Sequence, residues 1–300
     1  MKMMPAQALE SIPTVSEKDA DPAISAIFED IKETLEVPFV NLIWRHLATI
    51  PGGLSMTWSL AKPLYFSETL DVSARTMRKQ ASLVDTLTPW PAPVLSALGL
   101  TPQDKSEIVL LLEDYGHANS RALLVLSYLH RSIVSPSAHD AATSLKQSSV
   151  LTQLSTQLDP LAHLMQHKES QIKPARPLPA LAELPITVVE LVKILNTFGA
   201  SIPSPAEPSL YRHLSYWPSF LAAFWLAAEP LEQKGLLVRE SIAMQERAFS
   251  IVAQWKPAAL NQDTIAVDAI NQVSKSIDHF IHAVISRMIV HGDMMRRMIA

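Results

Sequence analysis

The stretch RHLATIPGGLSMTWSLAKPL at residues 45–64 occurs a second time in the chain, as RHLSYWPSFLAAFWLAAEPL at residues 212–231. The next segment, residues 74–84, keeps the same offset of 167 residues to residues 241–251. Solenoid repeats are much shorter, about 20–50 residues, so the pattern indicates one duplicated unit. We predict two tandem helical repeats that pack with pseudo-twofold symmetry. The matching pairs include Arg45/Arg212, His46/His213, Leu47/Leu214, Pro51/Pro218, Leu54/Leu221, Trp58/Trp225, Pro63/Pro230 and Leu64/Leu231.

The composition favours an all-α fold. Only 7 of the 300 residues are glycine, and no stretch alternates apolar and polar residues for long enough to form a sheet. The 22 prolines stand mostly between segments with helical spacing of apolar residues, where proline ends a helix. Hydrophobic residues make up 48 % of the chain, which is ample for a core. We therefore expect an all-α protein with a ligand pocket at the interface between the repeats.

We predict four segments along the chain. Residues 1–20 form an N-terminal lead-in, and residues 21–133 form helical repeat 1. Residues 134–185 are rich in serine and proline and form a linker with short helices, and residues 186–300 form helical repeat 2. The longer helices are expected at residues 23–35, 54–64, 70–87, 105–133, 186–198 and 264–298.

Charge and cysteine content exclude several classes of protein. The net charge of −4 gives no reason to expect nucleic-acid binding. The absence of cysteine excludes disulfides and thiolate chemistry and suits the cytoplasm. The start, MKMMPAQALESIP, lacks the apolar core of a signal peptide, and no run approaches the roughly 20 apolar residues that span a bilayer. We expect a cytoplasmic protein that binds no membrane, with a homodimer left open.

One polar cluster has the residue types of a general base. Glu113, Asp114 and His117 stand three and four positions apart on one predicted helix, so their side chains share a face. A histidine oriented by a carboxylate is a frequent base near neutral pH. The alternative is a solvated or core-capping polar cluster at a helix break around Gly116.

The Arg-His pair that opens each repeated stretch permits two interpretations. Arg45 and Arg212 could hold a carboxylate, because the guanidinium fork fits two carboxylate oxygens. A residue kept in both repeats more simply serves the shared fold, for example by binding carbonyl groups at a helix end. The carboxylate Glu207 lies in a proline-rich loop, where a solvated role is the simpler interpretation.

Two histidine pairs have a spacing that could chelate a metal ion. His163 and His167 lie in the predicted linker, and His279 and His282 follow Asp278. Neither pair has the glutamate of the HExxH zinc motif. We predict no metal site.

The first repeat resembles a known family. Residues 30–58, DIKETLEVPFVNLIWRHLATIPGGLSMTW, are similar to the N-terminal signature of the group I 2-haloacid dehalogenases. Further similar segments lie at residues 114–124, 159–161, 216–221 and 279–289. This family consists of all-α enzymes with an internal duplication that act on D- or DL-2-haloacids. The resemblance implies a reaction in which an aspartate activates a water, which displaces halide from C2 with inversion, without a metal or cofactor.

The resemblance also shows where this chain departs from the family. The catalytic aspartate, eight residues before Pro218, corresponds to Leu210, whereas the serine before it is retained as Ser209. The asparagine that helps hold the water corresponds to His117. A leucine cannot abstract a proton, so the family reaction needs a different base here.

Other pocket positions carry milder replacements. The family's tryptophan and phenylalanine correspond to Phe39 and Leu42, and its threonine and glutamate correspond to Ser67 and Asp71. From this correspondence we predict that the catalytic residues are His117, Asp114, Asp71 and Ser67. We predict that the substrate-binding residues are Phe39, Leu42, Ser209, Leu210, Tyr211 and Ile281.

Two functions follow from this interpretation. The first is a dehalogenase-like enzyme with reassigned catalytic residues that acts on a small, mostly apolar organic molecule or carboxylate. The second is a catalytically inactive member of the family that binds a small apolar ligand. In both cases hydrolysis of 2-haloacids by the family route is not expected.

Overall fold

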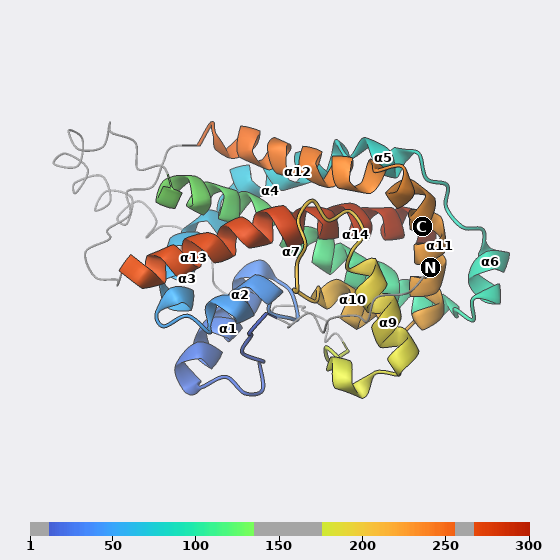
Figure 1. The fold of residues 1–300 in the computed structure, drawn as a ribbon, viewed down its shortest axis with the longest axis horizontal. Helices are drawn as coiled ribbons and strands as arrows, with labels where there is room; N and C mark the ends of the chain where they lie inside the picture. Colours follow the sequence, from blue (N-terminus) through green and yellow to red (C-terminus); the bar gives the residue numbers. More distant parts are fainter. Residues whose placement is uncertain (1–11, 135–175, 256–266) are drawn as a thin grey trace, which may run out of the picture.

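Every regular element in the described residues, which are 12–134, 176–255 and 267–300, is a helix in the computed structural model (Figure 1). This confirms the predicted all-α class. The first part of the chain contains α1 (Pro22–Leu35), α2 (Leu42–Leu47), α3 (Gly53–Tyr65), α4 (Glu68–Lys79), α5 (Ser82–Asp85), α6 (Ala92–Ala97) and α7 (Pro102–Val134). The second part contains the 3-10 turn η1 (Leu181–Glu183), α9 (Ile186–Leu195), α10 (Ser209–Leu214), α11 (Pro218–Gln233), α12 (Leu236–Val252), α13 (Val267–Phe280), the π-helical turn η2 (Ile281–Ile285) and α14 (Ser286–Ile299).

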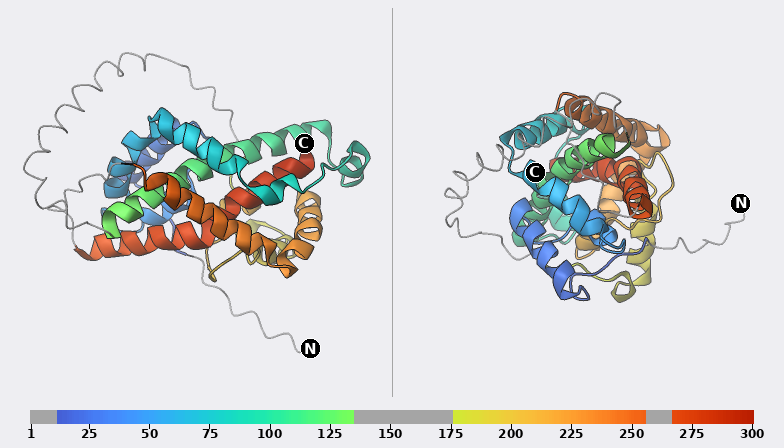
Figure 2. Two further views of the ribbon diagram at one scale, coloured as in Figure 1. Left: turned by 90° about the horizontal axis from the view of Figure 1, so that it is seen from above. Right: turned by 90° about the vertical axis from the view of Figure 1, so that its left-hand side faces the viewer.

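The long helix α7 forms the centre of the molecule. It packs against α14, α12, α4 and α13, so the other elements surround it (Figures 1 and 2). One continuous hydrophobic core includes residues from both halves of the chain. Within the described residues, no helix combines the length and apolarity that crossing a bilayer requires.

The sequence determines several helix ends locally. The side chain of Asp21 accepts a hydrogen bond from the backbone N–H of Ile24 at 2.8 Å, and Pro22 occupies the first turn of α1. Thr101 and Asp104 cap α7 reciprocally, because each side chain accepts from the backbone N–H of the other, at 3.1 and 2.9 Å. The helices expected at residues 23–35 and 105–133 are thus present, and they begin at Pro22 and Pro102.

Helix α7 continues through Gly116, where a break had been considered. The glycine admits the guanidinium of Arg78, since a Cβ built at position 116 would lie 2.5 Å from its Nη2 atom. Arg78 pairs with the buried carboxylate of Asp293 on α14. Gly116 therefore makes room for an ion pair that connects α4 and α14 across α7.

Two helix predictions need correction. The single helix expected at residues 70–87 is wrong, because α4 ends at Lys79 and the short α5 follows. The interruption directs Leu83 inward, where it is buried and its N–H donates to Glu240 of α12 at 3.4 Å. The helix expected at residues 264–298 starts outside the described residues, and a π turn that was not predicted divides it at residues 281–285. Most of the predicted linker, residues 135–175, also lies outside the described part.

The two repeated stretches of sequence share the position of one helix pair but not all side-chain contacts. Helices α2 and α10 both begin and end 167 residues apart. However, Trp58 donates to Asp30 at 2.7 Å, whereas the Nε1 atom of Trp225 has no partner in the described structure. Superposition of the repeats about a twofold axis stays a prediction.

Candidate functional site

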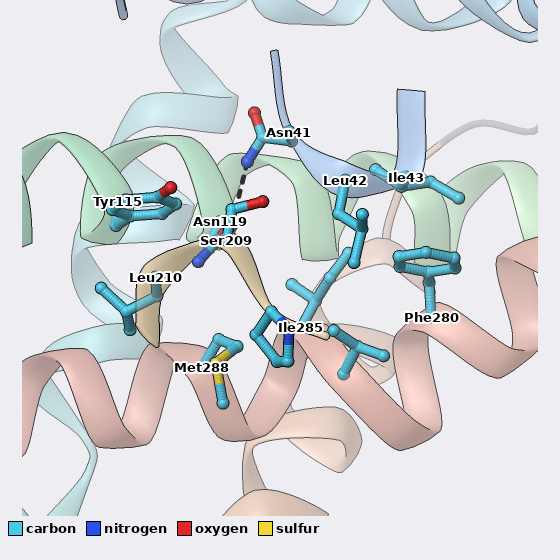
Figure 3. A pocket seen from close by; sticks show the side chains of 12 residues that line it. Asn41, Leu42, Ile43, Tyr115, Asn119, Ser209, Leu210, Phe280, Ile285 and Met288 are labelled. Carbon is cyan, nitrogen blue, oxygen red and sulfur yellow. Dashed lines mark hydrogen bonds between the residues drawn. The ribbon is translucent and has the colours of Figure 1, made fainter. Parts of the chain in front are cut away.

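A small cavity lies between α2, α7, α10 and the π turn (Figure 3). Its volume is about 30 Å³, which corresponds to roughly two water positions. One side of the lining is polar and the other is apolar. The lining residues are Asn41, Leu42, Ile43, Tyr115, Asn119, Pro208, Ser209, Leu210, Phe280, Val284, Ile285 and Met288.

The helix pattern explains how these residues meet. Tyr115 and Asn119 are four residues apart on α7 and therefore share one face. Asn41 and Ser209 lie at the start of α2 and α10, respectively, where these short helices approach that face. The π turn presents Val284 and Ile285 from the opposite wall, and such turns often occur at functional sites.

Two asparagine amides form the polar wall of the cavity. The Nδ2 atom of Asn41 donates to Oδ1 of Asn119 at 3.0 Å (Figure 3). Both residues are buried. The Oδ1 atom of Asn41 is also buried and has no hydrogen-bond partner in the described structure. A buried acceptor without a partner is rare in folded proteins, so a ligand or water is expected there.

A buried guanidinium lies directly behind Ser209. Arg45 is only 5 % exposed, and its Nη2 atom donates to Oγ of Ser209 at 2.9 Å. Its Nε atom has no partner, and none of the ion pairs among the described residues includes Arg45. Burial, with a further contribution from the nearby Arg212, lowers the pKa of Arg45, but arginine stays charged in proteins. The described side chains therefore give this charge no ion-pair partner, and the carboxylate of Glu17 acts on it only through space.

Tyr115 of the lining is paired with a histidine that lies behind it, outside the lining. The hydroxyl of Tyr115 and Nδ1 of His213 lie 2.6 Å apart, and Phe39 stacks on the Tyr115 ring at 4.3 Å between centroids. Burial, reinforced by Arg212, lowers the pKa of His213 to about 4. Burial also raises the pKa of Tyr115 well above its usual value. Both groups are thus neutral near pH 7, and neither adds a negative charge to the cavity.

Half of the predicted substrate-binding residues line the cavity. They are Leu42, Ser209 and Leu210. Phe39 lies one layer behind, against Tyr115. Two others lie elsewhere: Tyr211 is hydrogen-bonded to the buried His291, and Ile281 is buried in the π turn without lining the cavity.

The predicted catalytic residues of α7 do not line the cavity. His117 is two positions from both Tyr115 and Asn119, which on a helix turns its side chain by about 200°. Its Nε2 atom instead lies 2.9 Å from Nη1 of Arg121. Burial, followed by repulsion from Arg121, lowers the pKa of His117. The carboxyl of Asp114 is also absent from the lining, and burial, followed by Glu113, raises its pKa to about 6.

The other two predicted catalytic residues lie at α4. Asp71 forms an ion pair with Arg121, with 3.0 Å between Oδ1 and Nε. Arg121 also donates to the carbonyl of Tyr65 at 2.7 Å. Asp71, Arg121 and His117 therefore form a cluster between α4 and α7. Ser67 occupies the N-cap position of α4 but makes no capping bond from its side chain.

Sequence reasoning missed both amides. Asn119 follows Tyr115 by one helical turn, and that spacing identifies it as a second residue of the same face. Asn41 lies between Phe39 and Leu42 in the family signature at residues 30–58, and this position between two predicted pocket residues could have identified it. The π turn has no simple sequence signal. The lining residues in or beside it, Phe280, Val284 and Met288, were therefore missed.

The histidines considered for metal binding have other partners. His279 lies 2.9 Å from the hydroxyl of Ser204, and His282 lies 3.5 Å from Asp278. In the part of the chain that the structure describes, no group of three or more His, Asp or Glu side chains is arranged to hold a metal ion. His163 and His167 lie outside the described residues.

Comparison with known proteins gives two sequence relatives. A configuration-inverting 2-haloacid dehalogenase of Alcaligenes xylosoxydans xylosoxydans is 26 % identical over 121 residues, which cover 40 % of this chain and 41 % of the relative. An (R)-2-haloacid dehalogenase of Pseudomonas putida is 32 % identical over 75 residues, 23 % of this chain and 25 % of the relative. The matched segments thus span less than half of the relatives' own length. No family model matches the chain.

Solved structures match over nearly the full length. A D-2-haloacid dehalogenase in complex with L-LA has a TM-score of 0.76 at 17 % identity, with 99 % of both chains covered. A mutant D-2-haloacid dehalogenase with D-2-CPA has a TM-score of 0.73 at 15 % identity, with 97 % of both chains covered. This chain therefore has the all-helical fold of the D-2-haloacid dehalogenases. The two sequence relatives support its placement in the group I 2-haloacid dehalogenase family, as the signature at residues 30–58 predicted.

Proposed function

We propose that this protein binds a small organic carboxylate in the cavity between α2, α7, α10 and the π turn. The observation that carries the proposal is the buried guanidinium of Arg45, which has no anionic partner among the described side chains. A buried charge is costly unless it is paired. A bound carboxylate would supply the missing negative charge.

The polar wall offers the donors that a carboxylate needs. The hydroxyl of Ser209 and the Nδ2 atom of Asn119 belong to lining residues, and Arg45 supports Ser209 from behind. Hydrogen bonds to an ionised acceptor are stronger than neutral ones. The opposite wall, with Leu210 and Met288 among its residues, suits a short apolar substituent. The small volume of the cavity favours acids with few carbon atoms.

The lining supports binding without hydrolytic dehalogenation. It contains neither a carboxylate nor an imidazole, and position 210 offers only an alkyl group. Without a general base, a water in the cavity is not activated for attack on C2. The names of the relatives concern 2-haloacids, so the proposed ligand belongs to the same chemical class of small acids. We do not extend the hydrolytic dehalogenation of the relatives to this chain.

Reassigned catalysis is the second function under consideration. It is favoured by the Asp71–Arg121–His117 cluster, where a histidine with a lowered pKa is neutral near pH 7. However, the Nε2 atom of His117 is directed at Arg121, on a different face of α7 from Tyr115 and Asn119. Binding is therefore the function that the geometry supports better.

Titration calorimetry with acetate in a chloride-poor buffer tests the proposal. We expect saturable binding that Arg45→Met weakens at least tenfold. A matched control is Arg131→Met, because Arg131 donates to the carbonyls of Val252 and Trp255, away from the cavity. Equal weakening by both substitutions, or no binding of acetate to the unaltered protein at tens of millimolar, would contradict the proposal.

A further inference from the structure

The π turn determines which residue before Met288 faces the cavity. In an α-helix, residues seven positions apart share a face, since seven residues nearly complete two turns. An unbroken helix would therefore place Ile281 beside Met288, at the position that the sequence predicted. The π turn contains one residue more, because its hydrogen bonds span five residues instead of four. Phe280 consequently lines the cavity and Ile281 does not (Figure 3).

Side chains from outside the helix hold the π turn at this position. The carbonyl of His282, within the turn, accepts from Nε2 of Gln245 on α12 at 3.1 Å and from the hydroxyl of Ser201 at 2.9 Å. Ser286 and Arg287 also donate to carbonyls of the turn, but both belong to α14, which follows the turn directly. Gln245 and Ser201 therefore fix the turn relative to the rest of the molecule.

The buried amide of Gln245 is used entirely for this purpose. Its Nε2 atom donates to the carbonyl of His282 and to Oγ of Ser286, at 3.1 and 3.0 Å. Because a carbonyl can only accept, this contact assigns the nitrogen of the amide. The Oε1 atom therefore accepts from Nδ1 of His282, which lies 2.9 Å away. Every side-chain hydrogen bond of Gln245 in the described structure thus goes to the π turn or to the residue after it.

We infer that Gln245 determines the size of the acid that the cavity accepts, although its own side chain does not line the cavity. The inference rests on the proposed carboxylate site. A π turn can move along a helix by one turn while both helix ends stay in place, because backbone N–H groups only exchange their acceptors. Without the Gln245 amide, movement toward α13 brings Ile281 to the wall in place of the larger Phe280. Gln245 is thus a positioning residue that acts through Phe280.

Acetate and butyrate distinguish the two positions of the turn, since they share a carboxylate and differ in the length of the apolar chain. The cavity has a volume of about 30 Å³, so the unaltered protein should bind butyrate about tenfold more weakly than acetate in calorimetric titration, because overpacking is unfavourable. Gln245→Met keeps the length of the side chain and removes its hydrogen bonds. We expect this variant to bind the two acids within about twofold of each other, mainly through tighter binding of butyrate.

A matched control and a second substitution assign the effect. Thr57→Val should keep the preference for acetate, since Thr57 is buried and its hydroxyl donates to the carbonyl of Gly53, at 2.7 Å, within α3. Phe280→Leu removes the ring directly and should admit butyrate while Gln245 is intact. Addition of Gln245→Met to Phe280→Leu should then change the ratio of the two dissociation constants little, because changes that act through one wall are not additive.

The outcomes separate this inference from the proposed function. If acetate binds and Gln245→Met weakens both acids by the same factor, Gln245 has a purely structural role and the size inference is overturned, while the carboxylate site stands. Equal affinity of the unaltered protein for acetate and butyrate also overturns the size inference. Failure of both acids to bind the unaltered protein overturns the carboxylate site itself.

A second variant covers the case in which Gln245→Met does not fold. Ser201→Ala removes the other donor to the carbonyl of His282 and leaves Gln245 in place. It should shift the ratio of the two dissociation constants in the same direction as Gln245→Met, by a smaller factor. An unchanged ratio in this variant would then overturn the inference.

Discussion

Leu210 decides which chemistry the cavity permits. Its side chain is buried and lines the cavity beside Ser209. The resemblance to the dehalogenases predicted position 210 in the pocket, and Leu210 is one of the residues that line the cavity. It aligned the family's water-holding asparagine with His117, whereas the amides that line the cavity belong to Asn41 and Asn119. A shift of two residues on a helix moves a side chain to another face, so motif transfer without coordinates fails most easily on helices.

The first prediction concerns halide release. The unaltered protein should release no halide from D- or L-2-chloropropionate above background, because the cavity lining contains no base. Since Asn119 already supplies an amide, Leu210→Asp alone should give weak activity. Burial raises the pKa of a carboxyl group, so that activity should increase as pH rises and the base ionises. The isosteric Leu210→Asn is the control and should stay inactive. Brisk halide release by the unaltered protein would contradict this prediction.

At the scale of single elements, the sequence predicted where helices lie better than where they are interrupted. Helical spacing of apolar residues identified α7. The break between α4 and α5 depends on the contact of Leu83 with Glu240, which is 157 residues away along the chain. The π turn likewise reflects packing against distant helices. Local patterns cannot encode such contacts, so these features appear only in the folded chain.

The second prediction concerns Gly116, whose missing side chain leaves room for the guanidinium of Arg78. Gly116→Ala would place a Cβ 2.5 Å from the Arg78 guanidinium and force it away from Asp293. Alanine is a better helix former by about 0.8–1.0 kcal/mol, but separating a largely buried ion pair costs about 3–5 kcal/mol when one charge is left uncompensated. We therefore expect a net loss of about 2–4 kcal/mol in the free energy of unfolding, measured by urea denaturation.

A matched double substitution tests whether the loss of stability comes from the clash with Arg78. Arg78→Met with Gly116→Ala should be no less stable than Arg78→Met alone, because the clash is then absent. If Gly116→Ala by itself stabilises the protein, the guanidinium is free to move and the proposed constraint is wrong.

For the molecule as a whole, the core and the cavity join both halves of the chain. Helices α2 and α7 come from the first half, and α10 and the π turn come from the second. The duplication predicted that the repeats meet, since two copies of a helical unit bury their apolar faces against each other. It could not predict that Arg45 contacts Ser209 whereas its counterpart Arg212 contacts the carbonyl of Pro179.

The third prediction concerns the repeats. In an experimental structure, the Cα atoms of residues 23–133 should superpose on those of residues 186–300, with Arg45 over Arg212 and Trp58 over Trp225. The equal bounds of α2 and α10 at the 167-residue offset motivate this expectation. A best superposition that pairs different helices would refute it.

The fourth prediction concerns stability in acid. Burial lowers the pKa of His213 to about 4 and that of His291 to about 3, whereas an unfolded histidine titrates near 6.5. Below about pH 6.5 the unfolded chain therefore binds more protons than the folded one. These histidines contribute stability above that pH, and the contribution is lost as pH falls from about 6.5 toward 4. Asp114, whose pKa is raised to about 6, acts in the opposite direction and offsets part of the loss.

Urea denaturation at pH 7.5 and pH 5.0 measures this effect. The free energy of unfolding should be lower at pH 5.0. The double variant His213→Gln with His291→Gln should show a smaller difference between the two conditions, because glutamine does not titrate. An unchanged free energy of unfolding between the two conditions would show that the buried histidines do not control acid stability.

The unneutralised guanidinium of Arg45 has a practical consequence for laboratory work. If the cavity binds a carboxylate as proposed, it will take one from the medium, and acetate and formate are small enough to compete for it. Melting temperatures recorded in acetate buffer should therefore exceed those in a zwitterionic buffer of equal pH and ionic strength, since a ligand that binds only the folded state stabilises it. Affinities measured in carboxylate buffers would be underestimated for the same reason, so the choice of buffer salt enters every assay of this protein.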